Sequence, residues 1–150
     1  MRKIILALLF VAGTLTYTNA QKLEYKVVTV VESVVPMGMG RSRIIENKTE
    51  VDVQNFTTER RDGKDSKQGD VSRGEAKVDN FSEAKLLNFF SGVGINFQNI
   101  ASNDALITSK INQVVEEGWE LVFVTSGVES DAGKGDGDGI YITRFVFKKG

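Results

Sequence analysis

The sequence predicts an α+β fold, in which one principal helix packs on one face of a small, mainly antiparallel sheet. Three observations predict it. Residues 23–34 are rich in valine and are typical of a long strand. Residues 103–117 carry apolar side chains at helical spacing. Two further strand-like stretches, 119–125 and 140–148, are joined by a loop of glycine and aspartate and most simply form an antiparallel hairpin.

The first twenty residues have the features of a secretory signal peptide. Arg2 and Lys3 precede an apolar run over residues 4–12, and small residues lead to Ala20. The apolar run is about half of the ~20 residues that a spanning helix needs. We therefore expect cleavage after Ala20, no stable membrane insertion afterwards, and a periplasmic or secreted single domain over residues 21–150.

The first half of the domain is expected to supply most of the strands. Residues 23–34 have apolar side chains on both faces, which predicts an interior strand, and Pro36 with the glycines after it ends that strand. A second extended segment is expected from residue 41, either broken at residues 47 and 48 or continued through them into residues 50–54. Residues 59–77 are charged and glycine-rich with few apolar side chains, which predicts a flexible loop. Residues 81–90 favour a short helix, although their aromatic side chains also allow a strand.

The principal helix is expected to begin near Ser102 or Asn103, either of which can cap its first turn. Its apolar stripe consists of Leu106, Ile107, Ile111, Val114 and Val115. Gly118 stands where a left-handed C-terminal cap belongs. Trp119 follows it, and we expect its ring to pack over the end of the helix as a core residue rather than to stack on a ligand.

Composition excludes several classes of function. The chain has no cysteine and no histidine, which excludes disulfide stabilisation, Ser-His-Asp and Cys-His catalysis, and histidine-bound zinc. Two of its 19 basic residues lie in the leader, which leaves 17 against 20 acidic ones, a net charge of −3. This balance gives no basic surface for nucleic acid, so no nucleic-acid partner is expected.

Three stretches resemble a short bacterial domain family of unknown function. They read Tyr-Lys-Val-Val at 25–28, Glu-Gly-Trp-Glu-Leu-Val at 117–122 and Phe-Val-Phe-Lys-Lys at 145–149. Together with the stretches at 40–43, 98–104 and 126–130 they are similar to small exported proteins of Bacteroidetes-type bacteria. The resemblance covers the first strand and the last third of the chain. It implies a fold and a source but no activity, because the family has none assigned.

Arg41 and Arg43 form the first candidate site. They follow a glycine-rich turn and, two residues apart in an extended chain, point the same way. Two guanidinium groups on one face can bind a carboxylate or a phosphate on a partner. The alternative is that they form ion pairs with neighbouring glutamates such as Glu32 or Glu46.

Asp131, Asp136 and Asp138 form the second candidate site, for Ca²⁺. Their loop has the composition of a calcium loop. Ca²⁺ needs six or more oxygen ligands, which acidic side chains supply, and glycine allows the chain to bend around the ion. The spacing fits neither the twelve-residue helix–loop–helix calcium motif nor the glycine-rich nonapeptide repeat, however, and Lys134 lies inside the loop. The alternative is a plain hairpin loop, and no other cofactor is expected.

The leading hypothesis is an exported, non-enzymatic binding module for an unknown protein or cell-envelope component. One alternative is a carboxylate-dependent hydrolase or ligand-binding enzyme that uses some of its many acidic side chains, including Glu116, Glu117, Glu120 and Glu129. The other is a calcium-stabilised binding domain.

Export predicts a defined N-terminus. Protein recovered from outside the cytoplasm should begin at Gln21, because the signal peptide is removed after Ala20. Sequencing the N-terminus by Edman degradation or mass spectrometry measures this directly. An intact Met1 in that material would contradict the prediction.

Overall fold

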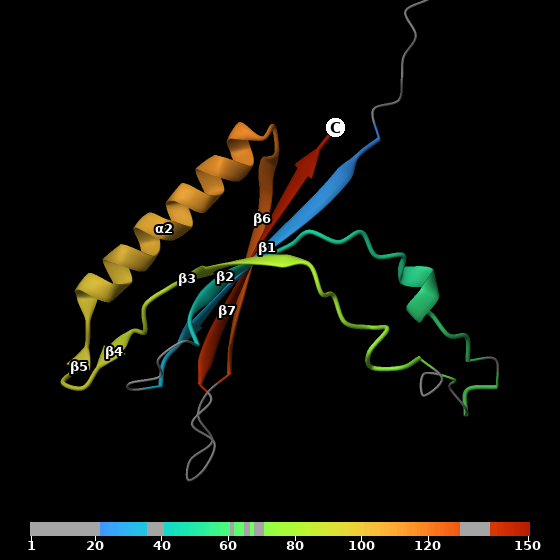
Figure 1. Cartoon of the computed structure of the whole chain (residues 1–150), viewed down its shortest axis with the longest axis horizontal. Coiled ribbons are helices and arrows are strands. Elements are labelled where there is room, and N and C mark those ends of the chain that lie inside the picture. Colours follow the sequence, from blue (N-terminus) through green and yellow to red (C-terminus); the bar gives the residue numbers. More distant parts are fainter. Residues whose placement is uncertain (1–21, 36–40, 61, 65–66, 68–70, 130–138) are drawn as a thin grey trace, which may run out of the picture.

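The computed structural model describes residues 22–35, 41–60, 62–64, 67, 71–129 and 139–150. They form a five-stranded antiparallel sheet with one main helix, α2 (Phe97–Glu116), on one face (Figure 1). The predicted α+β class is confirmed.

The strands of the sheet lie in the order β3 (Phe81–Lys85), β2 (Arg43–Asn47), β1 (Glu24–Ser33), β7 (Ile140–Lys149) and β6 (Glu120–Glu129). β1 is the central strand, as its two apolar faces predict. β6 and β7 form the expected antiparallel hairpin, with an irregularity in register between Leu121 and Phe123. All four neighbouring pairs are antiparallel.

The prediction of a helix over residues 81–90 was wrong. Residues 81–85 form β3, which pairs with the outer edge of β2 so that Ala84 lies opposite Ile44. Phe90 and Ser91 form the short strand β4 (Phe90–Ser91), which pairs with β5 (Gly94–Ile95). The open edge of β2 supplies hydrogen-bond partners that outweigh a weak local helix propensity.

The second extended segment is broken at Asn47, one of its two expected forms, and the further strand expected over residues 50–54 is absent. β2 ends at Asn47, and the alternating valines at 51 and 53 belong to no strand. Asp52 instead caps a short 3₁₀ helix, η1 (Val53–Phe56), because its side chain accepts a hydrogen bond from the backbone N–H of Gln54 at 2.9 Å. An aspartate before a turn competes with strand extension in this way.

The principal helix begins at Phe97, six residues before the predicted start. Asn96 is its cap and accepts a hydrogen bond from the backbone N–H of Asn99 at 3.1 Å. Asn103, predicted as a possible cap, is completely buried inside the helix. The polar residues at 102–104 resemble a helix start, but tertiary contacts of Asn103 explain its presence there.

The end of α2 follows the prediction. Gly118 has a φ of +87°, the left-handed conformation that allows the chain to leave the helix and enter β6. Lys149 Nζ donates to the carbonyl oxygen of Glu117 at 2.8 Å. The partly buried Trp119 packs against the core, as expected.

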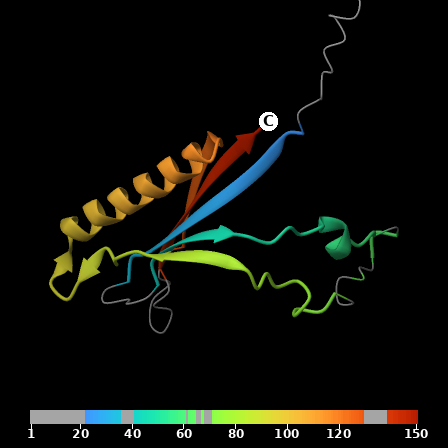
Figure 2. The same cartoon turned by 45° about the horizontal axis from the view of Figure 1, so that its top comes forward.

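The core lies between α2 and the sheet. Its buried residues come from three strands, the β3–β4 connection and the helix: Val28, Val30, Ile44, Leu86, Val114 and Phe147. No described helix covers the opposite face of the sheet (Figure 2), where Tyr25, Val27 and Phe123 are exposed. The described helix and sheet therefore form two layers.

The long segment between β2 and β3 extends away from α2 (Figures 1 and 2). Its described residues within 59–77 include no strand and no α-helix. Its predicted flexibility stays a prediction.

A buried and an exposed phenylalanine should differ in how much they stabilise the fold. Phe147→Ala should lower the free energy of unfolding by about 3–5 kcal/mol, because Phe147 is fully buried and its removal leaves a cavity. The matched control is Phe123→Ala on the helix-free face, where 60% of the residue is exposed and the loss should stay below about 1 kcal/mol. Urea unfolding followed by circular dichroism measures both, and equal losses would mean that the helix does not cover Phe147.

Candidate functional site

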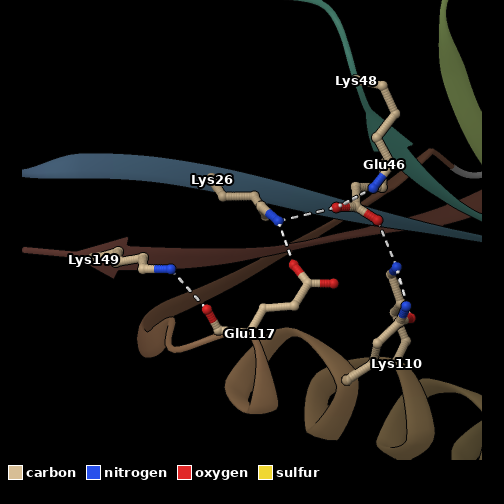
Figure 3. A network of polar contacts seen from close by, with 7 residues as sticks. Lys26, Glu46, Lys48, Lys110, Glu117 and Lys149 are labelled. Carbon is tan, nitrogen blue, oxygen red and sulfur yellow. Dashed lines mark hydrogen bonds and ion pairs between the residues drawn. The ribbon is translucent and has the colours of Figure 1, made fainter.

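Two glutamates lie on the helix-facing side of the sheet, and their surroundings differ. Glu46 on β2 is 1% exposed and is surrounded by Lys26, Lys48 and Lys110 (Figure 3). Its Oε1 lies 3.2 Å from the Nζ of Lys26 and 2.8 Å from that of Lys48. The Nζ of Lys110 on α2 donates to Oε2. We call these four residues the Glu46 cluster.

The lysines keep Glu46 ionised. Burial alone would raise the pKa of this carboxyl group, but the hydrogen bond from Lys110 and the contacts with Lys48 and Lys26 outweigh it and lower the pKa to about 2. Burial in turn would lower the pKa of Lys26, but its bonds to Glu117 and Glu46 leave that pKa raised. Each charge in the cluster therefore has an opposite charge beside it.

The Glu46 cluster continues toward the end of the helix. Lys26 Nζ lies 2.9 Å from a carboxylate oxygen of Glu117 and 4.7 Å from the centre of the Trp119 ring (Figure 3 shows the Glu117 contact). These contacts join β1, β2 and α2. Because its carboxylate oxygens already face lysines, the cluster is better suited to stabilising the fold than to binding a ligand.

The second glutamate, Glu32, lies in an open cavity of about 620 Å³ at the other end of the helix. We call it the Glu32 pocket. It lies where the N-terminal half of α2 and the β4–β5 hairpin meet the ends of β1, β6 and β7. Its lining is mostly apolar: Glu32, Val34, Phe89, Phe90, Ile95, Ile100, Val128, Tyr141 and Thr143.

Glu32 is held by a single amide. Asn103 Nδ2 donates to its Oε1 at 3.0 Å, and Oε2 has no hydrogen-bond partner among the described residues. Burial raises the pKa of Glu32; the bond from Asn103 lowers it and the nearby charge of Asp104 raises it further, and the net direction is upward. The pocket therefore presents an acceptor oxygen within an apolar wall.

Asn103 is the positioning residue of this site. Its side chain also accepts from the backbone N–H of Leu87 at 2.7 Å and donates to the carbonyl oxygen of Leu87 at 2.8 Å. Asn99 makes a similar bond to the carbonyl oxygen of Asn88 at 2.8 Å. The helix thereby fastens the chain segment that leads into β4 and fixes one wall of the pocket.

Sequence reasoning missed this site. Glu32 was considered only as a possible partner of the arginines, and Asn103 only as a cap. The available signal was a glutamate within a valine-rich strand, on the face that alternation assigns to Val28 and Val30. A charged residue at a core-facing position needs a partner or a ligand.

The structure brings Arg41 and Arg43 together on the helix-free face. They line a shallow hollow that Val31, Glu129 and Ile140 also border. The Nη1 atom of Arg43 lies 2.8 Å from a carboxylate oxygen of Glu83 on β3. The suggested partners Glu32 and Glu46 lie on the other face of the sheet. Binding of an anion by these arginines stays a prediction.

The predicted calcium ligands Asp131, Asp136 and Asp138 lie outside the described residues. Within the described part of the chain, no three acidic side chains are grouped so that they could hold a metal ion. Two of the carboxylates that the enzyme hypothesis named form ion pairs with lysines: Glu117 with Lys26, and Glu120 with Lys148 at 3.2 Å.

No protein-family model matches the chain, and comparisons with curated proteins and with solved structures give no match. The resemblance to a bacterial family of unknown function therefore stays a prediction. Among the described residues, no helix has the length and apolarity needed to cross a membrane.

The Glu46 cluster predicts an acid-sensitive fold. The pKa of the Glu46 carboxyl group is about 2 in the folded chain and near 4.5 in the unfolded chain. The unfolded chain therefore takes up the proton first as the pH falls. This stabilisation is complete above about pH 5 and is lost toward pH 2. Its size is on the order of 3 kcal/mol.

Urea unfolding between pH 7 and pH 3 measures this loss. Glu46→Gln should lower stability at pH 7 and flatten the pH dependence, because the neutral amide has no proton to gain. Glu83→Gln is the matched control on an exposed ion pair and should change stability little. An identical pH dependence in wild type and Glu46→Gln would contradict the assignment.

Proposed function

We propose that this chain is an exported, non-enzymatic binding module whose binding site is the Glu32 pocket. The ligand group is apolar and carries a cationic end that pairs with Glu32. One observation carries the proposal: a cavity of about 620 Å³ has an apolar lining with one carboxylate, and an oxygen of that carboxylate has no protein partner among the described residues. Sites for small apolar groups commonly combine these features.

Charge supports a cationic ligand group. A carboxylate in an apolar wall is unfavourable when it is ionised, and the raised pKa of Glu32 reflects this. An ammonium or guanidinium group that reaches Oε2 would form a charge-assisted hydrogen bond and remove the unfavourable state. An anionic ligand would add repulsion. The pocket should therefore select for cations among apolar ligands of equal length.

Binding is favoured over hydrolysis because carboxylate-dependent hydrolysis uses two carboxyl groups that face each other across the substrate. Among the described residues that line the pocket, Glu32 is the one carboxylate. The carboxylates at 117 and 120, considered as catalytic, are paired with lysines elsewhere. These observations support a site that holds a ligand without transforming it.

The proposal that the chain is exported rests on its first twenty residues. Its basic start, short apolar run and small residues before Ala20 support secretion or release into the periplasm. The resemblance to small exported bacterial proteins points the same way. We propose a protein or cell-envelope component as the natural partner. Calcium binding at Asp131, Asp136 and Asp138 is a separate alternative that this site does not require.

The test compares three ligands of equal chain length: octylamine, octanol and octanoate. Octylamine should bind at least tenfold more tightly than octanoate at pH 7, because only its ammonium group pairs with Glu32. Isothermal titration calorimetry measures the affinities, and NMR shifts of Phe89 and Tyr141 locate the site. Equal affinities for the three ligands, or shifts elsewhere, would contradict the proposal.

Glu32→Gln supplies the matched variant. Its amide oxygen can still accept from Asn103, but the charge is gone, so the preference for octylamine should disappear. Since burial raises the pKa of Glu32, the ionised side chain lowers stability at neutral pH, and this variant should melt at the same temperature as wild type or higher. Loss of binding therefore cannot be attributed to unfolding.

A further inference from the structure

β6 is an outermost strand with an open edge. It is ten residues long and pairs with β7 on one side; no described strand pairs with its other side. The backbone N–H and C=O groups along such an edge have no ladder partner, and another strand can satisfy them.

The two edges of the sheet differ in how they are protected. The opposite edge, β3, is five residues long and carries Glu83 and Lys85, and Glu83 is paired with Arg43. β6 has eight consecutive uncharged residues between its terminal glutamates and no proline. Its exposed apolar side chains are Val122, Phe123, Val124 and Val128. Charges and short length usually protect an edge from strand addition, and β6 has neither over its central part.

The Glu32 pocket reaches this edge. Glu32 on β1 lies opposite Tyr141 on β7, and Tyr141 lies opposite Val128 on β6. These three residues form one row across neighbouring strands, and all three line the pocket. A strand added to β6 would lie about 4.8 Å further out, and its residue opposite Val128 would extend the same row.

We propose that the partner binds as an extended segment that adds a sixth strand to the sheet at β6, with one apolar side chain of that segment in the Glu32 pocket. This inference rests on the proposed function and names the form of its ligand. Backbone hydrogen bonds to β6 supply affinity, while the pocket selects the side chain opposite Val128 and a nearby basic group for Glu32.

Charge favours a foreign segment over a second copy of this chain. Antiparallel pairing of β6 with itself along its full length would place Glu120 of one copy opposite Glu129 of the other, twice per dimer. Like charges directly opposite each other destabilise a strand pair. A segment with a basic residue opposite Glu129 would instead be attracted to it, while Glu120 also has Lys148 beside it.

The experiment selects ligands from a phage library of random ten-residue peptides on the exported chain. Enriched peptides should alternate apolar and polar residues, lack a central proline and carry lysine or arginine. A synthetic enriched peptide should slow hydrogen exchange of β6 amides and compete with octylamine for the Glu32 pocket.

Two proline variants, Thr125→Pro and Ser126→Pro, form a matched pair. Neighbouring residues of a strand direct their N–H groups to opposite edges, so one of the two donates toward β7 and the other outward. The outward variant should keep its melting temperature and lose at least tenfold in peptide affinity. The inward variant should melt at a lower temperature.

Several outcomes would overturn this inference while leaving the proposed function intact. Enriched peptides that bind without protecting β6 amides, or without competing with octylamine, would remove strand addition. Ultracentrifugation that shows a dimer of the unliganded chain, dissociated by the outward proline, would assign the edge to a second copy. Failure of octylamine itself to bind would instead count against the proposed function.

Discussion

The buried carboxylate of Glu46 is the constraint on which the rest of this structure depends. A lone charge at that depth would strongly destabilise the fold, so its three lysines must be in place whenever the chain is folded. Those lysines come from β1, from the residue that follows β2 and from α2. The contact between Lys110 and Glu46 therefore ties α2 to β2. Lys26 extends the same network to Glu117 at the end of the helix.

Asn103 fixes the other half of the helix, and the Glu32 pocket lies beside it. Glu32 and Glu46 occupy the same face of the same sheet, yet the pKa of Glu32 is raised and that of Glu46 is lowered. The difference is the number of donors: Glu46 has three cations, whereas Glu32 has one neutral amide. Three lysines balance the charge of Glu46, whereas no described cation pairs with Glu32, and this leaves its carboxylate as an acceptor for a ligand.

The pocket and the open edge of β6 combine two means of recognition. An unpaired edge offers a regular row of backbone donors and acceptors that any strand can use, so it gives affinity with little selectivity. The row Glu32, Tyr141 and Val128 joins that edge to a cavity with a charge in it. The Arg41–Arg43 hollow lies on the other face of the sheet, and its role stays separate from this site.

The sequence by itself determined the α+β class, the central position of β1, the β6–β7 hairpin and the left-handed turn at Gly118, because these depend on local patterns of apolar residues and on glycine geometry. Only the tertiary structure decided that residues 81–85 form a strand and that Asn103 lies inside the helix. Residues 81–85 form a strand because the open edge of β2, which lies far away in the sequence, supplies their backbone hydrogen-bond partners. The Glu32 pocket belongs to the same category, because its walls come from residues 32 to 143, and their meeting depends on how the helix and hairpins pack.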